Sequence, residues 1–535
     1  GENNIAIGKE ALHDVSTGSD NVAVGANALG ANTTANYNTA LGSYGLSANT
    51  YGTQNTSAGN QALSANISGH NNNAFGYVAL NANTTGSSNC AFGAHALDNN
   101  TTASNNTAVG HRAMDANTTA SNNTAVGRLA LTSNTTANDN VAFGSAALEF
   151  NTTGANNTAL GRLALNLNTT ASNNTAIGRS ALLSNTTGTY NTVVGSLATT
   201  QNTTGAYNTV LGGQGLQNNT SGDFNVAVGI FSLKNNTTAD NNVGVGAYAL
   251  NANTTGIENT AVGKNALQLN TTGSGNTAFG KDALFANTTV GGNTALGYKA
   301  LKANTTGAAN TAVGSGALDA NTTANNNTAV GDNALGANTE GSENTAVGRS
   351  TMADNTTGNQ NTAVGRKALQ VNTTGEKNTA LGFKAGDNIT TGDNNIVIGS
   401  EADTSSATVD NEITLGDTNI ATLRCNVQTI SSLSDARDKT NVIDLPEGLD
   451  FISKLRPVKF EWATRDGNGK DGSYEHGFIA QDLQTAQKEN DADYLNMVMD
   501  ENPDRLEASY GKLVPILVKA IQELTMEVNK LKSNG

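Results

Sequence analysis

The sequence predicts a mainly-β protein: a β-solenoid or β-roll of 17-residue repeats, followed by an α+β segment that ends in a coiled-coil helix. A glycine recurs every 17 residues from Gly8 to Gly416, through 25 units without an insertion. A fixed short period of this kind is the signature of a solenoid. All four prolines lie beyond residue 440, and proline is excluded from ladders that pair on both sides. Near the C-terminus, apolar residues alternate at spacings of 4 and 3 from Tyr510 to Leu531, which is a heptad pattern.

The composition excludes a conventional large-residue core for most of the chain. The sequence has 59 glycines, 4% aromatic residues and 14% charged residues, whereas ordinary domains carry roughly 25% charge. Disorder is the competing interpretation, but disordered chains lack regularly placed apolar residues. Here the apolar residues recur on the strict period, so we expect stacked coils.

Charge and cysteine usage narrow the class of function. The net charge of −15 and the pI of 4.7 argue against nucleic acid as a partner, which requires basic patches. Cys90 and Cys425 stand far apart and predict no disulfide framework. No apolar run is long enough to insert in a membrane. Because residue 1 is a glycine already inside a repeat, we expect a fragment or processed chain, without a signal peptide and lacking an N-terminal attachment domain.

Each repeat is too short for a helical hairpin. The consensus is Asn-Thr-Ala-Val-Gly-x-x-Ala-Leu-x-x-Asn-Thr-Thr-Gly-x-x. Turn residues at two places leave two short extended pieces, Thr-Ala-Val and Ala-Leu. We therefore expect two or three short strands per coil.

Individual positions of the repeat carry specific expectations. The position four residues before the recurring glycine is Asn in 24 of 25 units, and Glu412 replaces it in the last. Stacked amides can hydrogen-bond from coil to coil. The residue just before the glycine is large and apolar, as in Val24 and Leu41, with the exception of Ala58, and we expect it to face the core. The small residue before that, as in Ala23, suits the close approach of another backbone or subunit, and the glycine is expected to have positive φ.

The repeat resembles the head repeats of trimeric autotransporter adhesins, which carry an Asn-Ser/Thr-x-Ala-Ile/Val-Gly core in each coil. That resemblance implies a trimeric β-roll. The units here are longer than those of the adhesins, so the resemblance does not extend to handedness or interchain contacts.

Several motifs inside the repeats have plainer explanations than a ligand site. The Asn-Thr-Thr triplets satisfy the glycosylation sequon, but Asn and Thr also favour turns, and we favour the turn. Residues 275–281 imitate a phosphate-binding loop, yet Asp282 stands where Ser or Thr is needed. Asp occurs too sporadically for calcium-binding repeats. Regular threonines leave an ice-binding solenoid as a minor alternative. We predict no metal site and no cofactor.

After Gly416 the period stops. We divide the chain into a solenoid fibre at 1–420, a junction strand at 421–433 and a separate domain at 434–535. Within that domain a strand is expected over 455–462. A helix follows residues 476–482, and a heptad helix spans about 510–532.

Four blocks of the C-terminal segment occur in a specific order and spacing. They are Ser434-Asp-x-Arg-x-Lys439, Leu455-x-Pro-Val-x-Phe-x-Trp462, Gly477-Phe-Ile-Ala-Gln-Asp482 and Tyr510-x-x-Leu-Val-Pro-x-Leu-x-x-Ala-Ile-Gln-Glu-Leu524. Together they make residues 430–535 resemble the C-terminal intramolecular chaperone domain of phage tailspikes, tail fibres and endosialidases. The resemblance implies a domain that trimerises, templates folding of the fibre and then releases itself.

The resemblance also implies residue roles. Ser434 would be the nucleophile and Lys439 the general base of a self-cleaving serine peptidase that acts once in cis, at or beside the Leu433–Ser434 bond. Asp435, Arg437 and Gln481 support the motif. A lysine can take a proton from serine only when burial lowers its pKa. The alternative is structural: Ser434 caps a turn or helix, while Lys439 and Arg437 pair with Asp435 or Asp438.

The resulting hypothesis is a homotrimeric fibre of a virion that attaches to a host cell-surface receptor or glycan. The fibre would be registered by its C-terminal chaperone. A bacterial surface adhesin with the same chaperone is the main alternative. A polysaccharide depolymerase ranks lower, because the repeats offer no regular Asp or Glu row.

Overall fold

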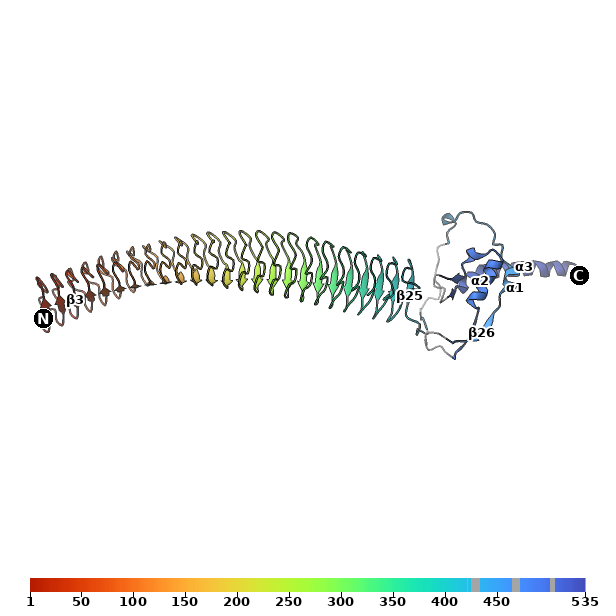
Figure 1. The fold of residues 1–535 in the computed structure, drawn as a ribbon, viewed down its shortest axis with the longest axis horizontal. Coiled ribbons are helices and arrows are strands. Elements are labelled where there is room, and N and C mark those ends of the chain that lie inside the picture. The colour runs from red at the N-terminus through yellow and green to blue at the C-terminus, as the bar shows by residue number, and fades with distance from the viewer. Residues whose placement is uncertain (421, 425–433, 464–471, 501–505, 535) are drawn as a thin grey trace. The chain divides into compact units, whose positions relative to one another are not determined.

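The computed structural model describes the chain except for residues 421, 425–433, 464–471, 501–505 and 535. It divides into two compact units, Gly1–Asn344 and Thr345–Gly535, and each is considered by itself. The described residues are mainly β, with one short parallel strand in every 17-residue coil (Figure 1). The predicted β-solenoid is confirmed. None of the described helices is long and apolar enough to cross a membrane.

The first unit consists of solenoid coils. Its strands are β1 (Ile5–Ile7), β2 (Val22–Val24), β3 (Thr39–Leu41), β4 (Thr56–Ala58), β5 (Asn73–Phe75), β6 (Cys90–Phe92), β7 (Thr107–Val109), β8 (Thr124–Val126), β9 (Val141–Phe143), β10 (Thr158–Leu160), β11 (Thr175–Ile177), β12 (Thr192–Val194), β13 (Thr209–Leu211), β14 (Val226–Val228), β15 (Val243–Val245), β16 (Thr260–Val262), β17 (Thr277–Phe279), β18 (Thr294–Leu296), β19 (Thr311–Val313) and β20 (Thr328–Val330).

The second unit holds the last solenoid coils and the C-terminal segment. Its strands are β21 (Thr345–Val347), β22 (Thr362–Val364), β23 (Thr379–Leu381), β24 (Ile396–Ile398), β25 (Ile413–Leu415), β26 (Val458–Glu461), β27 (Tyr474–Gly477), β28 (Val498–Met499) and β29 (Glu507–Ala508). Its helices are α1 (Leu449–Lys454), α2 (Ala480–Glu489) and α3 (Leu513–Asn534), with 3₁₀ turns η1 (Ala436–Asp438), η2 (Asp493–Leu495) and η3 (Tyr510–Lys512).

Strands in successive coils pair in parallel, and each residue pairs with the residue 17 positions on. Ala142 of β9, for example, pairs with Ala159 of β10. The second strand expected at Ala-Leu is wrong, because Leu148 lies in a turn with a φ of 52°. A left-handed residue cannot continue an extended strand. The turn is nonetheless laddered, since the Leu148 N–H donates to the Ala164 carbonyl at 3.0 Å.

The prediction that the large apolar residue before the glycine faces the core is also wrong. In β3, Ala40 is fully buried, whereas Leu41 is 45% exposed. Side chains alternate along a strand, so the buried Asn two residues before Ala40 fixes the alanine on the inner face and Leu41 on the outer one. The large core side chain is instead the Leu of Ala-Leu, such as Leu46, which is fully buried.

The recurring glycine occupies a corner that no other residue fits. Gly144 has a φ of 141°, and a Cβ on it would lie 2.5 Å from the carbonyl oxygen of Gly161 in the next coil. Both the backbone conformation and the close approach of the next coil therefore require glycine. The predicted positive φ is confirmed.

The predicted asparagine row is confirmed and extends into the backbone. Asn38 Oδ1 accepts from the Asn55 backbone N–H at 3.0 Å and from Asn55 Nδ2 at 3.2 Å. Asn38 Nδ2 in turn donates to the Gly52 carbonyl at 2.9 Å. The amide thus joins successive coils and satisfies a buried carbonyl, which would be costly to leave unpaired.

A second asparagine row, in the Asn-Thr-Thr triplets, went unrecognised in the sequence. Asn151 Nδ2 donates to Asn134 Oδ1 at 3.0 Å and to the Gly154 carbonyl at 2.9 Å. Its Oδ1 accepts from Asn168 Nδ2 at 2.8 Å. Since Asn151 is fully buried, this sequon nitrogen is not accessible in the folded coil, and the turn interpretation accounts for the triplet.

The C-terminal segment has its own small core. The core consists of Phe451, Leu483, Ala492, Met497, Val498, Leu513 and Ile516. The strand expected over 455–462 is present as β26, which pairs antiparallel with β27, and the helix expected after residues 476–482 is α2. Pro515 is the third residue of α3, where its missing N–H costs nothing. The junction strand expected at 421–433 falls mostly outside the described residues, and Thr422, Leu423 and Arg424 carry no strand.

Candidate functional site

The predicted dyad lies around a single 3₁₀ turn. Asp435 caps the turn η1, its carboxylate accepting from the Arg437 backbone N–H at 2.9 Å. The Lys439 N–H closes the turn by donating to the Ala436 carbonyl at 3.3 Å. A short polar side chain before a turn favours this geometry, and the turn returns the chain so that residue 439 lies beside residue 434.

The turn brings the two predicted catalytic side chains together. Lys439 Nζ lies 2.6 Å from Ser434 Oγ, which is hydrogen-bonding distance for a nucleophile and its base. Both side chains are exposed in the single chain.

The remaining charges of the turn are paired with each other. Arg437 Nη2 lies 2.6 Å from Asp435 Oδ2. Hydrogen bonds from the Arg437 side chain, and then from its backbone N–H, lower the pKa of Asp435. Arg437 therefore pairs with Asp435, as the alternative structural interpretation expects. Lys439 instead contacts Ser434.

Two predicted residues are not joined to this pair. Gln481 lies in the first turn of α2, where its backbone carbonyl accepts from Thr485 Oγ1 at 2.9 Å. Leu433, on the expected cleavage bond, lies outside the described residues.

The other sequence blocks converge on one another. Tyr510 Oη accepts from the Phe478 N–H at 3.2 Å and lies 3.3 Å from the Phe478 carbonyl. The two rings meet edge to face at 5.8 Å. Arg456 Nη2 donates to Asp482 Oδ2 at 2.9 Å. These contacts connect η3 to the residues between β27 and α2, and the residues before β26 to α2.

The heptad positions of η3 and α3 are exposed in the single chain. The buried residues of the helix are Leu513, Ile516 and Ala520. The heptad seam, by contrast, is exposed at every position: Tyr510, Val514, Leu517, Ile521, Leu524, Val528 and Leu531. The helix thus has two apolar faces, and the chain itself covers only one of them.

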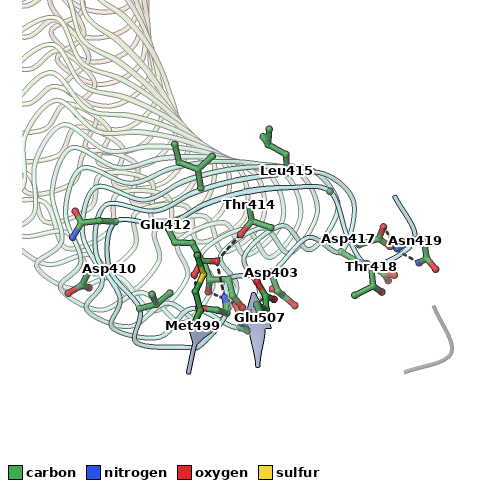
Figure 2. A pocket seen from close by; sticks show the side chains of 18 residues that line it. Asp403, Asp410, Glu412, Thr414, Leu415, Asp417, Thr418, Asn419, Met499 and Glu507 are labelled. Carbon is green, nitrogen blue, oxygen red and sulfur yellow. Dashed lines mark hydrogen bonds between the residues drawn. The ribbon is translucent and has the colours of Figure 1, made fainter. Parts of the chain in front are cut away.

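A polar pocket lies at the last coils of the solenoid (Figure 2). Glu412 replaces asparagine there and ends the first amide row. Its N–H donates to Asn395 Oδ1 at 2.8 Å, and its carboxylate accepts from Ser405 Oγ and Thr414 Oγ1. A carboxylate has no N–H, so the side chain of Glu412 cannot donate to Asn395 Oδ1 as an asparagine in this row does.

No cluster of His, Cys, Asp and Glu among the described residues could hold a metal ion. His13, His70 and His95 form hydrogen bonds with nearby side chains or backbone. His95 Nδ1, for example, lies 3.0 Å from Asp98 Oδ2.

Comparison with known proteins supports the identification of the C-terminal segment. Residues 434–491 match the model of a family described as Peptidase_S74, chaperone of endosialidase. The matched range begins at Ser434 and includes Lys439. No curated protein and no solved structure matches the chain. The family match and the β-solenoid together fit a tailspike- or endosialidase-type fibre with a C-terminal chaperone.

Proposed function

We propose that this chain is the subunit of a homotrimeric virion fibre that binds a receptor or glycan on a host cell surface. Its C-terminal segment acts as the intramolecular chaperone that aligns three chains, and it then releases itself by self-cleavage. The observation that carries the proposal is the exposed heptad seam of α3, beside a segment that matches a chaperone family.

The seam has the spacing of a helix that coils with identical helices. Spacings of 4 and 3 keep its residues on one stripe that coils with a like stripe. Leu513, Ile516 and Ala520 already anchor α3 to its own segment. Partner helices could therefore cover the seam without displacing the chaperone core.

The repetitive solenoid explains why the chains need a seed, that is, a segment that aligns them before their coils pair. Neighbouring coils present nearly the same side chains every 17 residues, so three chains could pair one or more coils out of phase. A repetitive sheet specifies its register weakly. A seed at one end fixes the register before the coils pair.

Self-cleavage follows from the turn at Ser434. Lys439 takes the Oγ proton while Ser434 Oγ attacks the carbonyl carbon of residue 433. The C–N bond breaks, the lysine passes the proton to the new amine, and water hydrolyses the resulting ester. Because Lys439 is exposed in one chain, burial by a neighbouring chain would make cleavage follow assembly.

A denaturing gel tests self-cleavage, and a native mass measurement tests trimer formation. The full chain is expected to yield a long piece ending near residue 433, a short piece spanning 434–535, and a trimeric mass before separation. Ser434→Ala is expected to give one full-length band and the same trimer, whereas Ser453→Ala, on α1, cleaves normally. Two bands from Ser434→Ala would remove Ser434 from the reaction.

The seam is tested on its own. Ile521→Lys places a charge in the exposed stripe and is expected to abolish the trimer in native mass measurements. Gln522→Lys, one residue on and outside the stripe, should leave the trimer intact. A trimer in both variants would contradict the assembly role of α3.

A further inference from the structure

One face of the solenoid carries an apolar row throughout the first unit, beside a row that is mostly threonine. The outer residues of each strand are the first and the third, such as Thr158 and Leu160 of β10. In none of the 25 units is either position charged. Several large side chains at these positions are exposed, among them Phe143 at 53%, and others are partly exposed. Monomeric proteins rarely expose an apolar strip of such length.

Two charged borders of opposite sign flank this face in Gly1–Asn344. The acidic border is the pair of positions six and five residues before the recurring glycine, and it holds seven acids and no Lys or Arg. The acids are Glu2, Asp20, Asp139, Asp223, Asp240, Glu258 and Glu343. The basic border is the pair of positions just after the glycine, with eight Lys or Arg and three acids. Because strands stack in register, each border runs along the coil stack on its own side of the strands.

Charges on both borders stand without an ion pair within one chain. Among the described residues of this unit, this holds for the acids Glu2, Asp20, Asp139, Asp223, Asp240 and Glu258 and for Arg128, Arg162, Arg179 and Lys264, whereas Lys9, Arg112 and Lys281 pair with neighbouring acids. In one coil, Glu258 and Lys264 lie on opposite sides of β16, and both are exposed. These charges are available to a partner.

We propose that the apolar face and its two borders form the interface between copies of this chain, which run parallel and in register, with the acidic border of one copy against the basic border of the next. This proposal rests on the homo-oligomeric fibre proposed above and specifies its contact surface.

The spacing of the apolar face indicates which partner can cover it. Whatever covers the strip must present an apolar row with the same spacing along many coils, and it must carry complementary charge on each side. This chain has that row and both borders in its own sequence. A second copy is therefore the matching partner.

The relative direction of neighbouring copies follows from the symmetry of the assembly. When copies are related by rotation about an axis parallel to the coil stack, the N-terminal side of each strand in one copy meets the C-terminal side in the next. That arrangement puts acids beside bases. Antiparallel copies would instead place each border against itself, and like charges side by side oppose association.

Co-expression of two single-cysteine chains tests the proposal. Both full-length chains carry Cys90→Ser, Cys425→Ser and Ser434→Ala, and one bears an affinity tag. One chain has Glu258→Cys and the other Lys264→Cys. After native mass measurement, a short bis-maleimide is added, and cross-linked pairs are resolved on a denaturing gel. Gln268→Cys, in the same coil but outside both borders, replaces Lys264→Cys in the control.

The expected result is a trimeric mass with cross-links only between unlike chains, at least tenfold above the Gln268→Cys control. Cross-links between like chains would place a border against itself and overturn the proposal. A trimer without cross-links above control would also overturn it, while leaving the fibre function intact. A monomeric mass would instead refute the fibre function itself.

Discussion

The carboxylate of Glu523, in the middle of α3, accepts a hydrogen bond from the backbone N–H of Leu449 at 2.7 Å. Leu449 is the first residue of α1, and Gly448 before it supplies no side-chain cap. Glu523 therefore caps a helix that is 74 residues away in sequence. A negative charge at a helix N-terminus is favourable, so this contact locks the heptad helix to the chaperone core.

Glu523→Gln should weaken that lock. The neutral amide can still accept the hydrogen bond but loses the charge interaction, so we expect a loss of about 0.5–1 kcal/mol in the stability of the C-terminal segment. The change is measured by thermal unfolding followed through the helical circular dichroism signal of the full chain. Glu527→Gln, one turn further along the same helix, is the control and should leave the transition unchanged.

The buried amide rows predict that replacing one of their asparagines by aspartate strongly destabilises the fold. Asn151→Asp removes two N–H donations, to Asn134 Oδ1 and the Gly154 carbonyl, and buries a charge. We expect at least ~2 kcal/mol of destabilisation, since each unsatisfied buried group costs about 1–3 kcal/mol. Asn156→Asp, at an exposed position of the same coil, should change the urea midpoint little. Equal midpoints for both variants would contradict the role of the ladder.

The effect of replacing a glycine should depend on how much space surrounds the added Cβ. Gly144→Ala meets the Gly161 carbonyl oxygen at 2.5 Å and should disrupt the stacking of two coils, seen as new protease-sensitive sites near residues 144–161. Gly275 also has positive φ, but nothing lies within 4 Å of an added Cβ. Gly275→Asn should therefore be tolerated, because asparagine adopts the left-handed conformation readily. Cleavage in neither variant would show that the coils accommodate the Cβ.

The last coils should respond to pH through Asp403. Burial, and then the nearby Asp387 carboxylate, raise the pKa of Asp403 from 3.8 to about 6. Between these values the folded chain binds more protons than the unfolded chain, so the contribution of Asp403 to stability is full below pH 3.8 and is lost as the pH rises through 6. Asp403→Asn keeps the acceptor for the Asn388 N–H and should slow hydrogen exchange in β24 at pH 7. At pH 4 the variant should match the unsubstituted chain, and slower exchange at both pH values would exclude titration of Asp403 as the cause.

The periodic features of the fold could be predicted from the sequence because they repeat. The unbroken spacing of the glycine gave the coil, its strand and its positive φ, and the asparagine row followed from the same alignment. The inward direction of Ala40 rather than Leu41 was missed because a large apolar residue is ordinarily the core residue. In a coil with one three-residue strand, the buried asparagine sets the alternation instead. The second strand failed for a similar reason, since Leu148 packs inward from a left-handed turn.

At the candidate site, the sequence blocks located the Ser434 and Lys439 pair, and the turn explains their contact. The cap from Glu523 to Leu449 could not be foreseen, because no local pattern connects residues so distant in the chain. The charged borders were present in the sequence but have meaning only once the strands are known to stack in register. An isolated Glu258 or Lys264 otherwise looks like ordinary surface charge.

The strict pairing of each residue with the one 17 positions on has an evolutionary consequence. A coil touches only the coils before and after it, so a gene that gains or loses whole 51-nucleotide cassettes keeps every remaining contact intact. Near-identical cassettes are also prone to unequal recombination. Related genes should therefore differ in copy number by whole cassettes, while any insertion of another length within a coil is purged.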